Sequence, residues 1–204
     1  MRLRSALPVL VLLVVSACHS PPVPDFSYYR LPDPAPLPHA VVKPVPMIVV
    51  EPFSAEGFYA DQAMIHALDP AANELRQYHY ALWIASPGTM LQRRLIGQLR
   101  DTGAARLVTG ELPASAPALR IHGTVLRFER VPVAGGGFRA HVELALRIVA
   151  PDGNLLSDRR YAADAPAAGT SLAASVAAAG QAVDRVFAEF WPELERTERT
   201  ADAH

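Results

Sequence analysis

The cysteine at position 18 has the most distinctive chemistry in this 204-residue chain, because it carries the only thiol. It directly follows Val15-Ser16-Ala17, and the chain opens with Arg2 and Arg4 before an apolar stretch from Leu7 to Val15. That stretch is shorter than the ~20 apolar residues a membrane-spanning helix needs, and its basic start is typical of an export signal. Residues 1–17 are therefore predicted to be a signal peptide that is removed before Cys18.

The segment Val15-Ser16-Ala17-Cys18 resembles a bacterial lipobox. The resemblance implies diacylglycerol on the Cys18 sulfur and a further acyl chain on its new amino group. Several buried acyl chains hold a protein on a membrane almost permanently, at about 0.8 kcal/mol per methylene. A plain signal peptide with a leftover thiol, or a buried cysteine in an apolar N-terminal helix, are the alternatives. His19 stands where an aspartate would signal inner-membrane retention, which favours the periplasmic face of the outer membrane.

Other catalytic or metal-binding patterns are missing from the sequence. The chain has no Gly-x-Ser-x-Gly motif, its histidines lack the spacing of a His-Glu-x-x-His zinc site, and Gly135-Gly136-Gly137 does not stand between a strand and a helix. A formal net charge of -1 leaves no basic footprint for nucleic acid. We therefore predict no catalytic residue, no metal and no cofactor, and expect a binding or docking role.

Aromatic and basic side chains gather in three short stretches, and such residues are enriched at protein interfaces. The candidate interface residues are Phe58, Tyr59, Tyr78, Tyr80, Arg93 and Arg94. For Tyr59 and Tyr78, a place in the core is an equal alternative, and Trp83 is expected to lie in the core. For the two arginines the alternative is a solvated helix face.

The elements that must position these residues begin after a proline-rich segment. Residues 18–46 are predicted to form a semi-rigid, extended spacer that lifts the domain off the membrane. Phe26 to Leu31 interrupts the spacer, and its aromatic residues favour docking on the body or pairing with a sheet edge.

The body, residues 47–191, is predicted to be a single α/β (α+β) domain with a mixed, largely antiparallel sheet and two main helices on one face. Its predicted strands are 47–51, 75–80, 105–108, 119–131, 138–148 and 154–163, and residues 62–68 are left as strand or helix. A bulge is expected near Val125, and hairpin turns are expected at 135–137 and 152–153. Strand 138–148 alternates most regularly, with apolar side chains at 138, 140, 142, 144, 146 and 148 on one face and polar ones on the other.

Both helices have recognisable ends. The first begins with Ser86 as N-cap and ends at Gly103; Leu91, Leu95 and Leu99 form its apolar stripe, whereas Gln92, Arg93, Gln98 and Arg100 are expected to face water. The second is capped by Thr170 or Ser171 and is expected to end at Pro192. Residues 192–204 are then predicted to be a charged, frayed tail.

Several segments in order resemble the ABC-type transport auxiliary lipoprotein family, which includes the PqiC-type lipoproteins. They are Tyr28-Tyr29-Arg30-Leu31, Val49-Val50-Glu51-Pro52, Gly57-Phe58-Tyr59-Ala60-Asp61, Tyr78-His79-Tyr80-Ala81-Leu82-Trp83, Leu91-Gln92-Arg93-Arg94-Leu95, Arg120-Ile121-His122-Gly123 and Arg127-Phe128-Glu129. The resemblance implies a fold like the amino-terminal domain of TolB and service to an ABC or MCE-type system that moves phospholipid or other hydrophobic molecules between the two membranes.

The implied partners are an MCE-type periplasmic protein, its ABC permease and ATPase, the membrane through the acyl chains, and further copies of the same chain. Two other functions stay open. One is a lipid carrier with an apolar pocket between sheet and helix, and the other is an envelope hydrolase.

Overall fold

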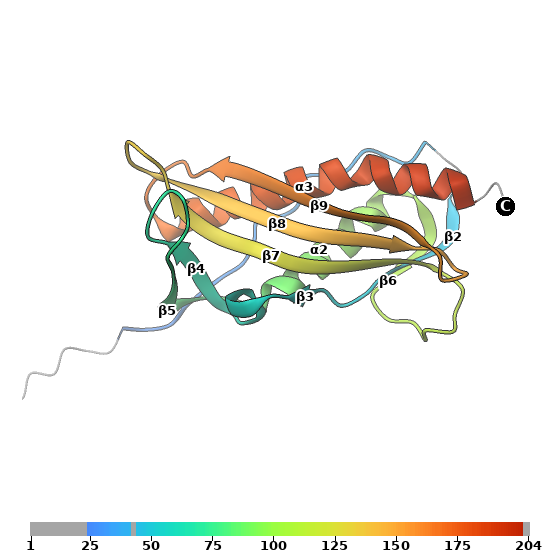
Figure 1. Ribbon diagram of the computed structural model, residues 1–204, viewed down its shortest axis with the longest axis horizontal. Helices are drawn as coiled ribbons and strands as arrows, with labels where there is room; N and C mark the ends of the chain where they lie inside the picture. The colour runs from blue at the N-terminus through green and yellow to red at the C-terminus, as the bar shows by residue number, and fades with distance from the viewer. Residues whose placement is uncertain (1–23, 42–43, 202–204) are drawn as a thin grey trace, which may run out of the picture.

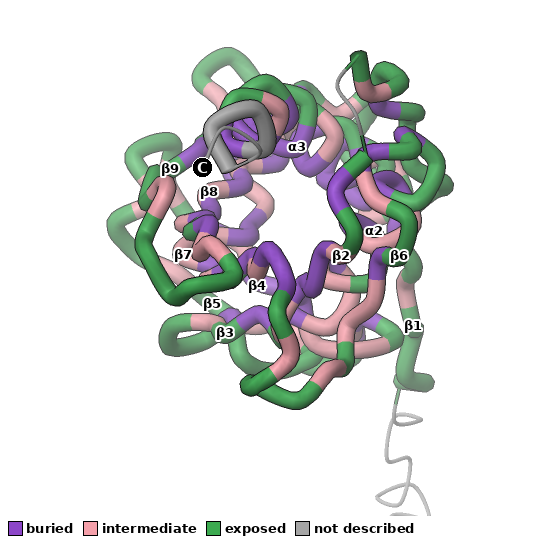
Figure 2. The backbone as a smooth tube through the Cα atoms, turned by 90° about the vertical axis from the view of Figure 1, so that its right-hand side faces the viewer, coloured by how far each residue is buried: buried purple, intermediate pink, exposed green. Residues whose placement is uncertain are grey.

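The computed structural model describes residues 24–41 and 44–201, so the predicted signal peptide and Cys18 lie outside the described residues. The elements are β1 (Ser27–Tyr29), β2 (Val45–Val50), β3 (Ser54–Ala55), the 3-10 helix η1 (Gly57–Ala60), β4 (Ala63–Ala67), β5 (Leu75–Trp83), α2 (Pro87–Thr102), β6 (Ala105–Thr109), β7 (Leu119–Pro132), β8 (Phe138–Val149), β9 (Leu155–Pro166) and α3 (Leu172–Ala201). They form one curled, mixed sheet with two main helices, which confirms the predicted fold class. Figure 2 shows the buried segments turned toward the centre of the curl, beside α2 and α3.

Strand β7 is the centre of the sheet. One edge pairs along its length with β8, and the other edge pairs in turn with β2, β3 and β4. The β7–β8 register shifts between Val125 and Arg127, so the predicted bulge is confirmed. The three glycines that follow β7 all have positive φ, a backbone conformation that glycine adopts without steric cost. Strands β7, β8 and β9 thus form a long antiparallel meander (Figure 1).

The core lies between this meander and α3. Alternate residues of β8 are buried, as the sequence predicts, and Val183, Phe187 and Phe190 of α3 are 1% exposed or less. The ring of Tyr161 on β9 meets the edge of Phe190 at 5.7 Å between centroids. Each fully buried aromatic or branched side chain contributes about 1.5–3 kcal/mol, so this interface is a major source of stability.

Helix α2 begins and ends where predicted. The Ser86 hydroxyl accepts a hydrogen bond from the Thr89 amide, and Gly103 is left-handed at φ 72°. The expectation that Gln98 faces water is wrong, because this residue is 2% exposed. Its position is buried by a segment far away in the sequence, the proline-rich residues described below.

The prediction that the second helix ends at Pro192 is wrong, because helix α3 continues to Ala201. Proline removes one backbone donor from a helix interior, yet the following turn is held in place because Leu194 is fully buried and Thr197 is 7% exposed. The Thr197 hydroxyl donates to the Leu194 carbonyl at 2.8 Å. Packing of these two residues stabilises the helix beyond Pro192, so the predicted tail is helical as far as the structure describes it.

The described part of the proline-rich segment lies on the body instead of standing away from it. We call residues 24–41 the strap. Its strand β1 pairs in parallel with β5, and Leu31 and Leu37 are buried in the core. Figure 1 shows the strap running past the helices behind the long meander. Three residues of the strap form β1, and contacts that a free spacer would lack fasten the part that follows to both helices.

Candidate functional site

The strap is held by polar side chains of both helices. Arg94 of α2 donates from Nε and Nη2 to Asp184 Oδ1 of α3, at 3.0 and 2.7 Å, and from Nη1 to the Pro32 carbonyl at 2.6 Å. The other Asp184 oxygen accepts the backbone amide of Ala35 at 3.1 Å. The Arg94 and Asp184 side chains are only 6% and 17% exposed, so this ion pair forms a partly buried clamp.

Two further contacts complete the attachment. The Gln98 amide donates to the Ala35 carbonyl at 2.6 Å, which explains why this polar residue is buried. On α3, Gly180 lies directly under the strap, and a Cβ there would come within 2.6 Å of the Pro32 ring. Only a residue without a side chain allows this close approach. Helix α2, helix α3 and the strap therefore form one packed unit.

Of the candidate interface residues, Arg94 thus points inward and is not available to a partner at the surface. Tyr59 is also internal: it is 8% exposed, and its hydroxyl donates to the Glu129 carboxylate. Glu129 is completely buried and is also paired with Arg127. Burial, followed by the hydrogen bond and negative charge of Glu129, raises the pKa of Tyr59 well above its ordinary value. Tyr59 therefore stays protonated and acts as a structural donor.

Tyr78 takes an intermediate position. Its ring centroid lies 4.3 Å from that of His66, and its hydroxyl accepts a hydrogen bond from Arg130 at 2.7 Å. Burial is the main reason why the pKa of His66 lies below its ordinary value. Tyr78 thus connects strand β5 to strand β7 and is half-buried.

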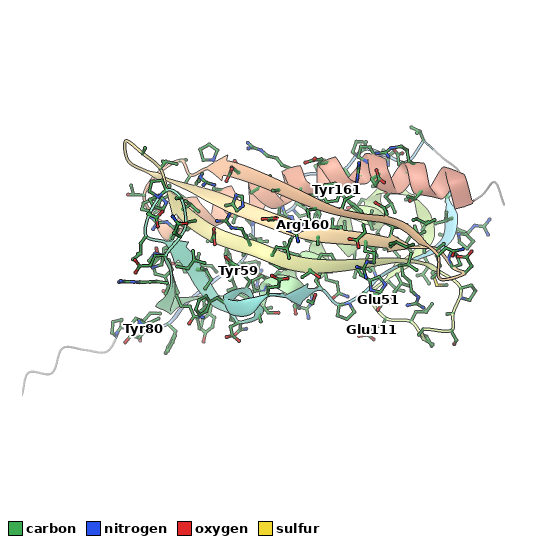
Figure 3. All side chains as sticks on the ribbon, in the orientation of Figure 1. Glu51, Tyr59, Tyr80, Glu111, Arg160 and Tyr161 are labelled. Carbon is green, nitrogen blue, oxygen red and sulfur yellow. The ribbon has the colours of Figure 1, made fainter. Side chains whose placement is uncertain are left out.

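Phe58, Tyr80 and Arg93 remain at the surface. Phe58 on η1 is 53% exposed, Tyr80 is 39% exposed, and Arg93 projects from the exposed side of α2. In Figure 3, Tyr80 lies at the end of the molecule where the described chain begins, whereas Tyr59 lies farther along it. The structure therefore divides the six predicted residues between a structural group and a surface group.

A continuous apolar face around Tyr80 was not predicted as a unit. Tyr80 and Leu82 lie on the side of β5 opposite the buried Ala81 and Trp83, and the exposed Ile84 directly follows the strand. Across the parallel pairing Tyr28 is level with Leu82, and the Phe26 ring lies 5.5 Å from that of Tyr80. We call this the β1–β5 outer face; its members are Phe26, Tyr28, Tyr80, Leu82 and Ile84. The alternation of residues 26, 28 and 80–84 was visible in the sequence, but the pairing that joins them was not.

Two open clefts border the outer face. One, of about 370 Å³, lies between the strap and α2 and is lined by Arg30, Arg93 and Ile84 together with Asp33. The other, of about 540 Å³, includes Asp25, Tyr29 and Tyr80. By contrast, the space between the sheet and α3 near Phe128 and Ala179 is about 20 Å³, enough for a water molecule but not for an acyl chain.

Within residues 24–41 and 44–201, no three His, Cys, Asp or Glu side chains come together in a way that would hold a metal ion. The same residues contain no helix with the length and apolar character needed to cross a membrane.

Comparisons with known proteins find solved structures with a similar fold. The chain resembles the crystal structure of protein XCC0632 from Xanthomonas campestris, with a TM-score of 0.71 and 21% identity over 85% of this chain and 99% of that one. It also resembles the hypothetical protein CT253 from Chlamydia trachomatis, with a TM-score of 0.53 and 10% identity over 76% of this chain and 99% of that one. A comparison with curated protein sequences finds no match. The model of the ABC-type transport auxiliary lipoprotein component matches residues 29–190, most of the chain, and the chain therefore belongs to this family.

Proposed function

We propose that the chain is a lipoprotein acylated at Cys18 and held on the periplasmic face of the outer membrane. There it serves as a docking component of an ABC/MCE-type system that moves phospholipid or other hydrophobic molecules between the two membranes. Membership of the auxiliary lipoprotein family supports an accessory role in ABC-type transport. The lipobox-like Val15–Cys18 supports the anchor, and His19 after it favours the outer membrane. The proposed role involves no reaction and needs no cofactor.

The observation that carries the docking proposal is the fixed strap. Phe26 follows Cys18 by eight positions and already contacts Tyr80 on the body. From there the Arg94–Asp184 clamp and Gln98 hold the strap on both helices. The chain toward the anchor therefore leaves the body at one fixed end, whereas a spacer that was free along residues 24–41 would leave that end undefined. A defined orientation is what a docking component needs, because its partner arrives from a fixed direction.

The partner surface is assigned to η1. Phe58 is an exposed aromatic side chain next to the buried Tyr59, so a rigid base supports it. Large aromatic residues on rigid supports are typical anchors of protein interfaces. The proposed partner is the periplasmic part of an MCE-type protein that works with an ABC permease and ATPase. Self-assembly of this chain around the end of such a conduit is part of the proposal, and sedimentation of the acylated protein in detergent tests it.

Site-specific photocrosslinking in cells tests the docking role. A photoreactive phenylalanine replaces Phe58 in one strain and Leu155, equally exposed but on β9, in the control strain. We expect the Phe58 variant to form an adduct that mass spectrometry identifies as the MCE-type protein, and the Leu155 variant to form none. If neither position formed an adduct, or if both formed the same adduct, the proposed surface would be contradicted.

A further inference from the structure

The β1–β5 outer face has no partner within the part of the chain that the structure describes. Phe26 and Tyr28 are 57% and 61% exposed, and Tyr80 and Ile84 are 39% and 43% exposed. Leu82 joins the two pairs across the strands. Isolated apolar residues are common on protein surfaces, but contiguous apolar patches mark sites of interaction. This face is therefore a candidate site for an occupant that the structure does not contain.

The chain outside the structure points to that occupant. The face begins at Phe26, eight positions after Cys18, and a fully extended chain of that length spans at most about 28 Å. Because the strap is fastened to both helices, the point at which the body meets this short connection is fixed near Phe26. With Cys18 acylated, the outer face stays within a few tens of ångströms of the lipid surface.

The charges around the face fit a phospholipid surface. Arg30 and Arg93 line the cleft that also contains Ile84, so cationic groups adjoin the apolar residues. Among the described residues, neither guanidinium makes a hydrogen bond or ion pair, whereas the neighbouring Arg94 is occupied by Asp184. Asp33 is the acidic side chain on the same lining. Tyrosine rings gather at the interface between lipid and water, and nearby arginines are attracted to anionic headgroups.

We infer that the β1–β5 outer face is a membrane-contact surface: Phe26, Tyr28 and Tyr80 enter the interfacial layer of the bilayer that holds Cys18, while Arg30 and Arg93 are attracted to headgroups with a net negative charge. The inference rests on the proposed lipid anchor and goes beyond it, because it fixes how the body sits on the membrane. It leaves Phe58 on η1 for the protein partner. Figure 1 shows the β8–β9 turn at the far end of the long axis, so that end points into the periplasm.

Fluorescence quenching in vesicles tests the orientation. The full mature protein, purified with its anchor, is placed on vesicles made of equal amounts of phosphatidylcholine and phosphatidylglycerol, with or without bromine on the acyl chains. Phe26→Trp is the probe and Leu155→Trp is the matched control at the far end, each read against the signal of the native Trp83 and Trp191. We expect bromine to quench the Phe26→Trp emission and to leave the Leu155→Trp emission unchanged.

A second arm tests the charges. Adding Arg30→Gln and Arg93→Gln to Phe26→Trp is expected to reduce quenching on the vesicles with phosphatidylglycerol and to have no effect on phosphatidylcholine alone. An equal change in quenching on the two kinds of vesicle would contradict the proposed headgroup contact.

Flotation of the same vesicles separates the failures. If the protein floats with the vesicles but Phe26→Trp stays unquenched, the membrane-contact surface is wrong and the anchor stands. If the protein floats no better than Cys18→Ser, the anchor itself fails, and the inference fails with it. If Phe26→Trp is unquenched on lipid but shifts to the blue when the MCE-type protein is added, the face is a protein interface instead.

Discussion

Replacing Arg94 by alanine is expected to release the strap. The substitution removes the ion pair with Asp184 and the hydrogen bond to the Pro32 carbonyl. It also leaves Asp184, 17% exposed, without its cation. Removing one partner of a buried ion pair costs about 3–5 kcal/mol, and the residual exposure of Asp184 places the expected loss near ~3 kcal/mol. In a domain of this size such a loss lowers Tm by roughly 6–12 °C.

The matched control is the adjacent residue. Arg93 lies on the same turn of α2 and is exposed, and among the described residues its guanidinium makes no hydrogen bond to the strap, although it lines the same cleft. Arg93→Ala is therefore expected to change stability by less than about 0.5 kcal/mol. In the double variant Arg94→Ala with Asp184→Ala, the loss should be smaller than the sum of the two single losses, because neither charge is then left alone.

Trypsin offers an assay specific to the strap, since Arg30 is exposed and the next residue, Leu31, is buried. If cleavage after Arg30 follows the population of the released strap, a loss of 3 kcal/mol speeds it about a hundredfold. Urea unfolding measures the global loss in parallel. If Arg94→Ala behaved like Arg93→Ala in both assays, the reasoning about the clamp would be refuted.

Three more substitutions or conditions test other parts of the structure. Gly180→Ala is expected to destabilise the protein by about 1–3 kcal/mol, because the new methyl group meets the proline ring of the strap. Gly97→Ala on α2 has open space around its new methyl group and should stabilise the protein by up to about 1 kcal/mol. Thermal unfolding compares the two variants, and equal shifts in Tm would contradict the close approach of the strap to Gly180. Tyr59→Phe removes the hydroxyl that donates to the buried Glu129 carboxylate and should lower the free energy of unfolding in urea by about 1–3 kcal/mol. A loss below ~0.5 kcal/mol would argue against that hydrogen bond. Burial lowers the pKa of His66 below 6.5, so the unfolded chain takes up the proton first and the free energy of unfolding falls as the pH drops below that value. The urea midpoint measures this fall, and His66→Gln should make the midpoint depend less on pH.

Much of the fold could be predicted because its signals are local. The alternation in β8, the phase change near Val125 and the Ser86 cap each follow from residues that are neighbours in the chain, and all three are confirmed. The contacts that override local signals could not be predicted in the same way. Gln98 is buried only because the strap covers it, and the turn after Pro192 remains helical only because Leu194 packs into the core.

The surface was harder to predict than the core. Phe58 and Tyr59 are adjacent aromatic residues in one short helix, yet one is exposed and the other is hydrogen-bonded to a carboxylate about 70 positions away. The sequence contains no local signal that separates them. The same holds for Arg93 and Arg94, where the position of Asp184 on another helix decides which guanidinium is buried. The outer face depends on parallel pairing between segments 54 positions apart, so its members could be listed from the sequence but not assembled.

Both the docking role and the membrane orientation require the lipid anchor at Cys18, and the mass of the mature N-terminus tests this anchor directly. Proteolysis of the protein extracted from membranes, followed by mass spectrometry, should yield an N-terminal peptide that begins at Cys18 and carries diacylglycerol and an additional acyl chain. A peptide that begins at Cys18 or elsewhere with a free, unmodified thiol would contradict the lipid anchor, and with it the proposed orientation and docking role.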